Sequence, residues 1–177
     1  KLVIGFTSVV TFAVIISATA FYGLNMLQEN TQKMYDKDLI GISVLRSMNR
    51  DINVIGRTVN RMALASNFGD EAGIQKGKEA ILKVRPGLSS NYEKSKGTII
   101  RPELKAKVDA LGVTLSDFNT QIDSIIASLE NKGGAAAAYK IISSKEYQDT
   151  LAKVMGEIKE IADIKVEGAA KNMEAAA

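Results

Sequence analysis

Apolar residues recur at alternating steps of three and four along three long segments of this chain. Such spacing places apolar side chains on one stripe of an α-helix and is typical of the seam of a left-handed bundle or coiled coil. A weaker pattern of the same kind lies between the first two segments, so the chain is expected to be all-α. The residues of these patterns are, in chain order, Leu45, Met48, Ile52, Ile55, Val59 and Met62; Ile74, Ile81, Leu88 and Tyr92; Leu104, Val108, Leu111, Leu115, Phe118, Ile122, Ile125 and Leu129; and Tyr147, Leu151, Val154, Ile158 and Ile161.

Turn-forming residues separate these segments and set the number of helices. Residues 67–70, 96–97 and 131–134 are rich in Asn and Gly, and Pro102 suits an early position in a helix. Because short connections make neighbouring long helices antiparallel, we predict an antiparallel up-down-up-down four-helix bundle. Pro86 lies inside the second helix and is expected to kink or split it. The four helices are expected over about residues 29–67, 71–97, 102–131 and 135–177.

The N-terminal segment predicts where the protein is located. Residues 2–28 carry no charged side chain, and this run exceeds the roughly 20 apolar residues needed to cross a bilayer. Residues 1–28 are therefore expected to form a transmembrane anchor helix, continuous with the first helix of the bundle, and residues 29–177 are expected to be exported. The alternative is a secretory signal, because Ala18-Thr19-Ala20 resembles a cleavage site. The length of the run and the unbroken helical pattern after it favour an uncleaved anchor. The first residue is not Met, so this N-terminus is expected to be truncated.

Composition removes several classes of function. The chain has no cysteine, histidine or tryptophan, which excludes zinc-finger ligand sets, cysteine nucleophiles and histidine-based acid–base catalysis. Its net charge of +3 is too small to indicate a nucleic-acid partner. No acid–base pair of recognisable spacing is present. We therefore predict no catalytic residues, no metal site and no cofactor.

One face of the first bundle helix carries an unusual row of cations. The row consists of four arginines, which fall on a helical wheel at roughly 0°, 40°, 20° and 60° in chain order. The seam residues lie on the opposite side of the helix, at roughly 160° to 260°. Asn53 and Asn60 lie along the edge of the row. Asp51 falls at roughly 140° and is expected not to face the row, so these guanidinium groups find no carboxylate on their own helix. The members of this arginine row are Arg46, Arg50, Arg57 and Arg61.

Three interpretations of the arginine row are open. Most charged stripes are solvated faces, and pairing with acids on a neighbouring helix or subunit is a second unremarkable outcome. A solvated helix usually mixes charges of both signs, however, and this row contains arginine without lysine. Because the arginine fork suits bidentate recognition of carboxylate or phosphate, we favour an anion-binding site.

The order of segments resembles a known family. The stretches "MYDKDLIGISVLRSM" and "SNYEKSKGTIIRPELKAKVDAL" are similar to the start of the first helix and to the junction of the second and third helices in the periplasmic sensory module of bacterial methyl-accepting chemotaxis receptors. The resemblance is to the aspartate and serine receptor family and covers nearly the whole chain. It implies a homodimer in the bacterial inner membrane, anchored by its N-terminal helix, with the residues after about 28 in the periplasm.

The resemblance also implies a ligand site. In that family, arginines of the first helix bind amino-acid carboxylates at the dimer interface, and "GRTVNRMAL" resembles the arginine pair, which corresponds to Arg57 and Arg61. The aspartate receptor has a further arginine where this chain has Ile52, and Arg50 is placed to substitute, so a different anion is expected. Tyr139 and Ser143 of the fourth helix are expected to form the opposing wall. The ligand is expected to be a small carboxylate: a dicarboxylate, tricarboxylate, amino acid or aromatic acid.

The function implied is ligand sensing without chemistry. Binding would favour one arrangement of the subunits, and a small sliding of the fourth helix would carry the signal across the membrane. Two alternatives are kept: a sensor module of the same fold in a histidine kinase or cyclase, and a ligand-free, membrane-anchored interaction bundle.

Overall fold

The chain folds into long helices, in agreement with the prediction of an all-α protein. The computed structural model describes the backbone of residues 2–99, 101–131 and 134–174, and these ranges contain no strand. The elements are α1 (Leu2–Lys33), the π-helix η1 (Met34–Leu39), α2 (Ile40–Asn67), α3 (Glu71–Gly97), α4 (Pro102–Glu130), α5 (Ala135–Ile142) and α6 (Lys145–Glu174).

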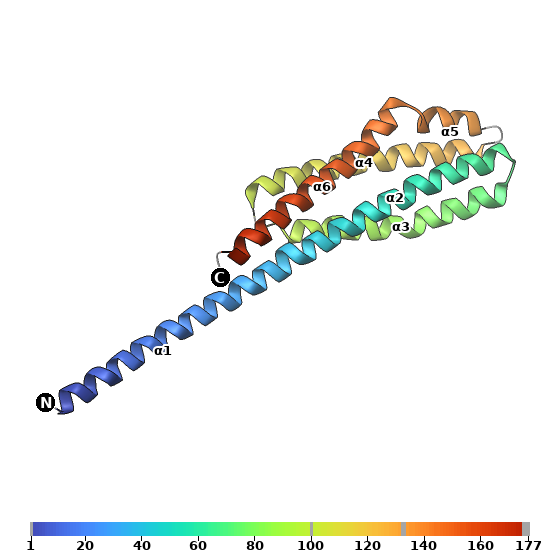
Figure 1. Cartoon of the computed structure of the whole chain (residues 1–177). Coiled ribbons are helices and arrows are strands. Elements are labelled where there is room, and N and C mark those ends of the chain that lie inside the picture. Colours follow the sequence, from blue (N-terminus) through green and yellow to red (C-terminus); the bar gives the residue numbers. More distant parts are fainter. Residues whose placement is uncertain (1, 100, 132–133, 175–177) are drawn as a thin grey trace.

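The first three elements form one uninterrupted helical rod. Its first part, α1, projects alone from the end of the bundle, whereas α2 lies within the bundle (Figure 1). Within α1, the segment Val10–Glu29 is long and apolar enough to cross a membrane, and none of it is buried against the rest of the chain. A large apolar surface left unburied by the protein is suited to an apolar environment outside it.

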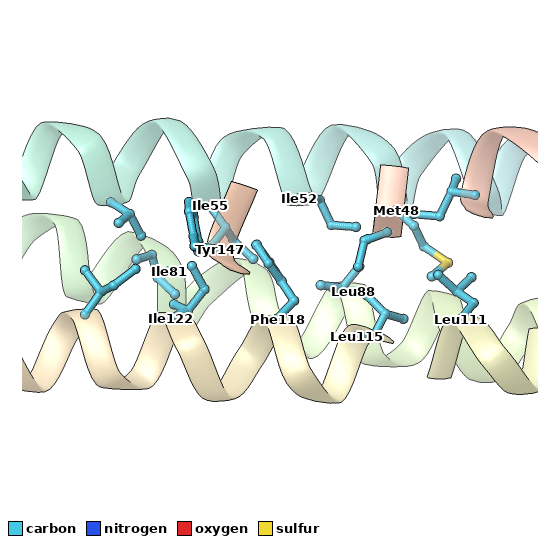
Figure 2. Close-up of a cluster of buried hydrophobic side chains, with 14 of the residues drawn as sticks. Met48, Ile52, Ile55, Ile81, Leu88, Leu111, Leu115, Phe118, Ile122 and Tyr147 are labelled. Carbon is cyan, nitrogen blue, oxygen red and sulfur yellow. The ribbon is translucent and has the colours of Figure 1, made fainter. Parts of the chain in front are cut away.

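The predicted seams form the core. Every seam residue of α2 and of α4 is buried, and together they make one continuous apolar cluster. In the last seam Leu151 is half-buried and packs against this cluster, and the other members are buried. Figure 2 shows side chains of α2, α3 and α4 meeting around Tyr147 and Phe118. The antiparallel four-helix bundle is therefore confirmed.

The fourth helix of the bundle differs from the expectation. Instead of one helix over residues 135–177, α5 ends at Ile142 and α6 begins at Lys145. The hydroxyl of Ser144 accepts a hydrogen bond from the backbone N–H of Tyr147 at 3.2 Å and donates one to the carbonyl of Ile141 at 2.7 Å. A serine that satisfies backbone groups in this way ends one helix and starts the next.

Pro86 does not interrupt α3, which is continuous from Glu71 to Gly97. A proline in a helix leaves the carbonyl four residues earlier without its N–H partner. Here both Pro86 and Leu82, the residue with that carbonyl, are exposed, so water can take the place of the missing donor. The expected split is therefore wrong because the proline lies on the solvent side of the helix.

Candidate functional site

The arginine row lies on the outer face of α2. Arg46, Arg50, Arg57 and Arg61 are all exposed, whereas the seam residues on the opposite side of the helix are buried. The sequence folds in this way because burial of the apolar stripe turns the opposite face of the helix outward.

The expectation that the arginine row finds no carboxylate on its own helix is wrong for Arg50. The guanidinium of Arg50 donates from both Nε and Nη2 to Oδ1 of Asp51, at 3.3 Å each. The wheel angle of Asp51 placed its Cα away from the row, but the long arginine side chain bends along the helix to reach the neighbouring residue. Arg50 is thus partly neutralised, and its side chain remains 73% exposed.

The row divides into two pairs with different surroundings. Arg46 and Arg50 line a groove of about 680 Å³ between the first half of α2 and the end of α6. Arg57 and Arg61 lie further along α2, toward the end of the bundle remote from α1 (Figure 1), and do not line this groove. The other residues of the groove are Leu39, Ile42, Ser43, Ser47, Val166, Ala169 and Ala170.

Arg57 and Arg61 are both open to an external anion. In the part of the chain that the structure describes, neither makes a hydrogen bond or an ion pair with another side chain. They are separated by one helical turn, so both guanidinium groups can approach one ligand from the same side. This pair can supply up to four N–H donors to a carboxylate.

Asn53 and Asn60 are weaker candidates for anion binding than their positions on the helical wheel indicated. Asn53 donates to the carbonyl of Asn49 at 2.8 Å, and Asn60 donates to the carbonyl of Gly56 at 3.0 Å. These amide groups are therefore directed along their own helix. A ligand would compete with those bonds, so the guanidinium groups remain the stronger anion donors.

Tyr139 and Ser143 lie on α5 and directly after it. The hydroxyl of Ser143 donates to the carbonyl of Tyr139 at 2.6 Å, and the side chain of Tyr139 is partly exposed. Although α5 packs against α2, no hydrogen bond among the described residues joins these two side chains to the arginine row. The contribution of Tyr139 and Ser143 to the site therefore stays a prediction.

Tyr147 was predicted as a seam residue, and the structure adds a close neighbour on α2. Its ring stacks on Phe118 with the centroids 6.4 Å apart, and its hydroxyl lies 4.0 Å from the position that a Cβ on Gly56 would take. The first residue of α2 after Gly56 is Arg57. The beginning of α6 therefore contacts α2 directly beneath the outer arginine pair.

A family comparison agrees with this architecture. A family model described as the four helix bundle sensory module for signal transduction matches residues 1–177. The chain belongs to this family. It is a four-helix-bundle sensory module of the methyl-accepting chemotaxis receptors, and the resemblance inferred from the sequence is confirmed at the level of the family. Searches of curated proteins and of solved structures found no match.

Proposed function

We propose that this sensory module binds a small organic acid through Arg57 and Arg61, in a membrane-anchored chemoreceptor. The observation that carries the proposal is the exposed guanidinium pair on the outer face of α2, which has no acidic partner in the described chain. Arginine prefers planar anions and binds carboxylates bidentately. A dicarboxylate, tricarboxylate, amino acid or aromatic acid has the carboxylate that this pair needs.

The proposed location is the bacterial inner membrane, with the bundle in the periplasm. The apolar segment Val10–Glu29 supports an anchor, because it is long enough to span the bilayer and makes no buried contact with the bundle. Arg57 follows Glu29 by 28 residues, or about 42 Å of helix, so the ligand would bind far from the membrane.

The proposed site lies at or near a homodimer interface. A twofold interface uses the same patch on both subunits, and an outward-facing row on α2 meets that requirement. Tyr139 and Ser143, which make no hydrogen bond to the row among the described residues, are proposed to form the opposing wall of the site. Signal transmission is proposed to run through α6, whose first turn places Tyr147 beneath Arg57 and whose last part lies beside the start of α2.

The expected affinity follows from the number of charged contacts. Each hydrogen bond to a charged group contributes roughly 1.5–3 kcal/mol. Three or four such bonds correspond to micromolar binding, which requires about 8 kcal/mol.

The test is a thermal-shift and calorimetric titration of the full chain in detergent micelles against one acid of each class. A ligand at 100 times its Kd adds about 2.7 kcal/mol of stability, which is roughly 5–10 °C in Tm for a chain of this size. Arg57→Ala and Arg61→Ala should each abolish that shift while the helical circular dichroism stays unchanged. Lys83→Ala, which removes an exposed cation from α3, is the matched control and should respond as the wild type does.

Two results would contradict the proposal. Undiminished affinity in either arginine variant removes that residue from the site, and a ligand-saturated monomer in light scattering removes the interface. A chain that responds to no acid of any class would favour the ligand-free interaction bundle instead.

A further inference from the structure

A buried lysine lies at the end of the bundle where α1 emerges. Lys165 of α6 is only 1% exposed, although lysine almost never occupies a fully buried position without partners. Its ammonium Nζ donates to the carbonyl of Lys37 at 2.9 Å and to the carbonyl of Thr98 at 2.8 Å. Oδ1 of Asp38 lies 3.9 Å from the same nitrogen. Burial of a charge is costly unless it is paired in this way.

These contacts join parts of the chain that are far apart in sequence. Lys37 and Asp38 belong to η1, Thr98 follows the last residue of α3, and Lys165 lies in the second half of α6. Figure 1 shows the end of α6, the connection between α3 and α4, and the start of α2 together at this end of the bundle. One ammonium group therefore links three of the segments that meet there.

The lysine also occupies a seam position. The seam steps of α6 from Ile158 to Ile161 continue by four residues to Lys165, and the seam of α2 extends backward from Leu45 to Gly41 and Asp38. Both charged residues thus stand where the heptad pattern calls for apolar side chains. In coiled coils a single polar residue at such a position fixes the register of the helices at a cost in stability.

The backbone around the lysine is shaped to receive it. A Cβ on Gly41 would lie 2.9 Å from Cε and Nζ of Lys165 and 2.7 Å from Oγ1 of Thr98, so even a methyl group here requires the end of the lysine side chain or the Thr98 hydroxyl to move. The contact at Lys37 falls within the π-helix η1. A π-turn takes carbonyls out of the i to i+4 ladder and marks functional positions in helices. The ammonium supplies a donor at this irregular point.

We propose that Lys165 is a latch that fixes the register of α6 against the α1–α2 rod, and that sliding of α6 requires its ammonium to leave the carbonyls of Lys37 and Thr98. The role of the sliding in signalling rests on the function proposed above, whereas the latch itself does not depend on a ligand. The latch lies at the junction between the bundle and the apolar helix α1. A shift of α6 relative to the rod would have to change the contacts at this junction.

The test measures the register directly with two spin labels on the full chain in lipid nanodiscs. Val54 on α2 and Ala170 on α6 are both exposed, and they lie on opposite sides of the latch along the bundle axis, separated by about 27 Å of helix rise. In the wild type their distance distribution should be narrow. Lys165→Met keeps most of the side-chain volume but removes the donors, and should widen the distribution and move its mean by about 1–2 Å, the size of helix shifts in switching proteins.

Two further variants make the result specific. Gly41→Ala keeps the lysine and its charge but blocks its place, and should reproduce the Lys165→Met distribution. Lys159→Met, at an exposed position of the same helix, should superimpose on the wild type. Circular dichroism of each variant checks that the bundle is folded. If Lys165→Met does not fold, Gly41→Ala provides the test of the latch.

The possible outcomes separate this inference from the proposed function. A folded Lys165→Met or Gly41→Ala chain with the wild-type distribution overturns the latch, even if an acid still moves α6. A shifted distribution in both variants supports the latch, and it does so even if no acid moves the labels in the wild-type chain, a result that would count against the ligand site alone.

Discussion

The hydroxyl of Tyr147 gives the sharpest stability prediction. The residue is 2% exposed, and its Oη has no hydrogen-bond partner in the described part of the chain. A buried polar group without a partner costs about 1–3 kcal/mol of desolvation. Tyr147→Phe removes this cost and keeps the ring that stacks on Phe118. We therefore expect the variant to be more stable than the wild type by about 1 kcal/mol at pH 7, or roughly 2–4 °C in Tm.

The same substitution has a predictable pH dependence. Burial raises the pKa of the Tyr147 phenol above its ordinary value of 10.0. Between pH 10.0 and the raised pKa, the folded chain keeps a proton that the unfolded chain has lost, so the stability of the wild type falls as the pH rises through this window. Tyr147→Phe lacks this proton. Its stability advantage should therefore grow above pH 10.

Urea unfolding followed by circular dichroism, at pH 7 and at points up to pH 11, measures both effects. Tyr92→Phe is the matched control, because the Tyr92 hydroxyl donates to the carbonyl of Val108 at 3.2 Å and its loss should destabilise the bundle by about 1 kcal/mol. If Tyr147→Phe were less stable than the wild type by a similar amount, the Tyr147 hydroxyl would have a partner, and the reasoning from an unpaired group would be refuted.

Two other changes have expected outcomes that can be measured by the same method. Asp70→Ala removes the side chain that accepts from the backbone N–H of Gly73 at 2.8 Å at the start of α3, and should cost about 1 kcal/mol in urea unfolding; a loss below a few tenths would mean that the cap contributes little. Burial lowers the pKa of Lys165 from its ordinary value of 10.5, with Arg101 and Lys37 acting in the same direction and Asp38 against it. The unfolded chain then holds a proton that the folded chain has released, so wild-type stability should rise as the pH approaches 10.5. Lys165→Met should lack this rise, and an unchanged slope would show that Lys165 is not the group responsible.

The core was predictable because its signal is local and repeated. A seam residue is buried wherever the helix is packed, and each member reinforces the same period, so Leu45 to Met62 and Leu104 to Leu129 could be assigned from spacing alone. The end of α5 depended instead on which backbone groups the Ser144 hydroxyl bonds. The pair Ser143-Ser144 before Glu146 is the signal that could have located this break.

The polar interactions were less predictable, for two physical reasons. The bond from Arg50 to Asp51 depends on side-chain rotamers, which a wheel of Cα positions does not contain. The burial of Lys165 could have been predicted, since it continues the seam of α6, but a lysine on a helix with a mixed-charge face is usually solvated. Its partners lie on other elements, so the pattern of one helix could indicate burial but not the bonds that make burial tolerable.

The positions of Arg57 and Lys165 bear on how the proposed receptor would transmit a signal. Arg57 lies on the outer face of α2 in the half remote from α1, and the Lys165 cluster lies in the seam at the end near α1, with the apolar core between them. Such a core deforms little and moves between discrete arrangements. If a ligand shifts α6 against α2 near Tyr147, small rearrangements within such a core could not take up that shift. The shift would have to reach Lys165, a seam position where α6 is held by hydrogen bonds rather than by apolar packing. The strength of those bonds then sets how much ligand binding energy is needed to move the helix.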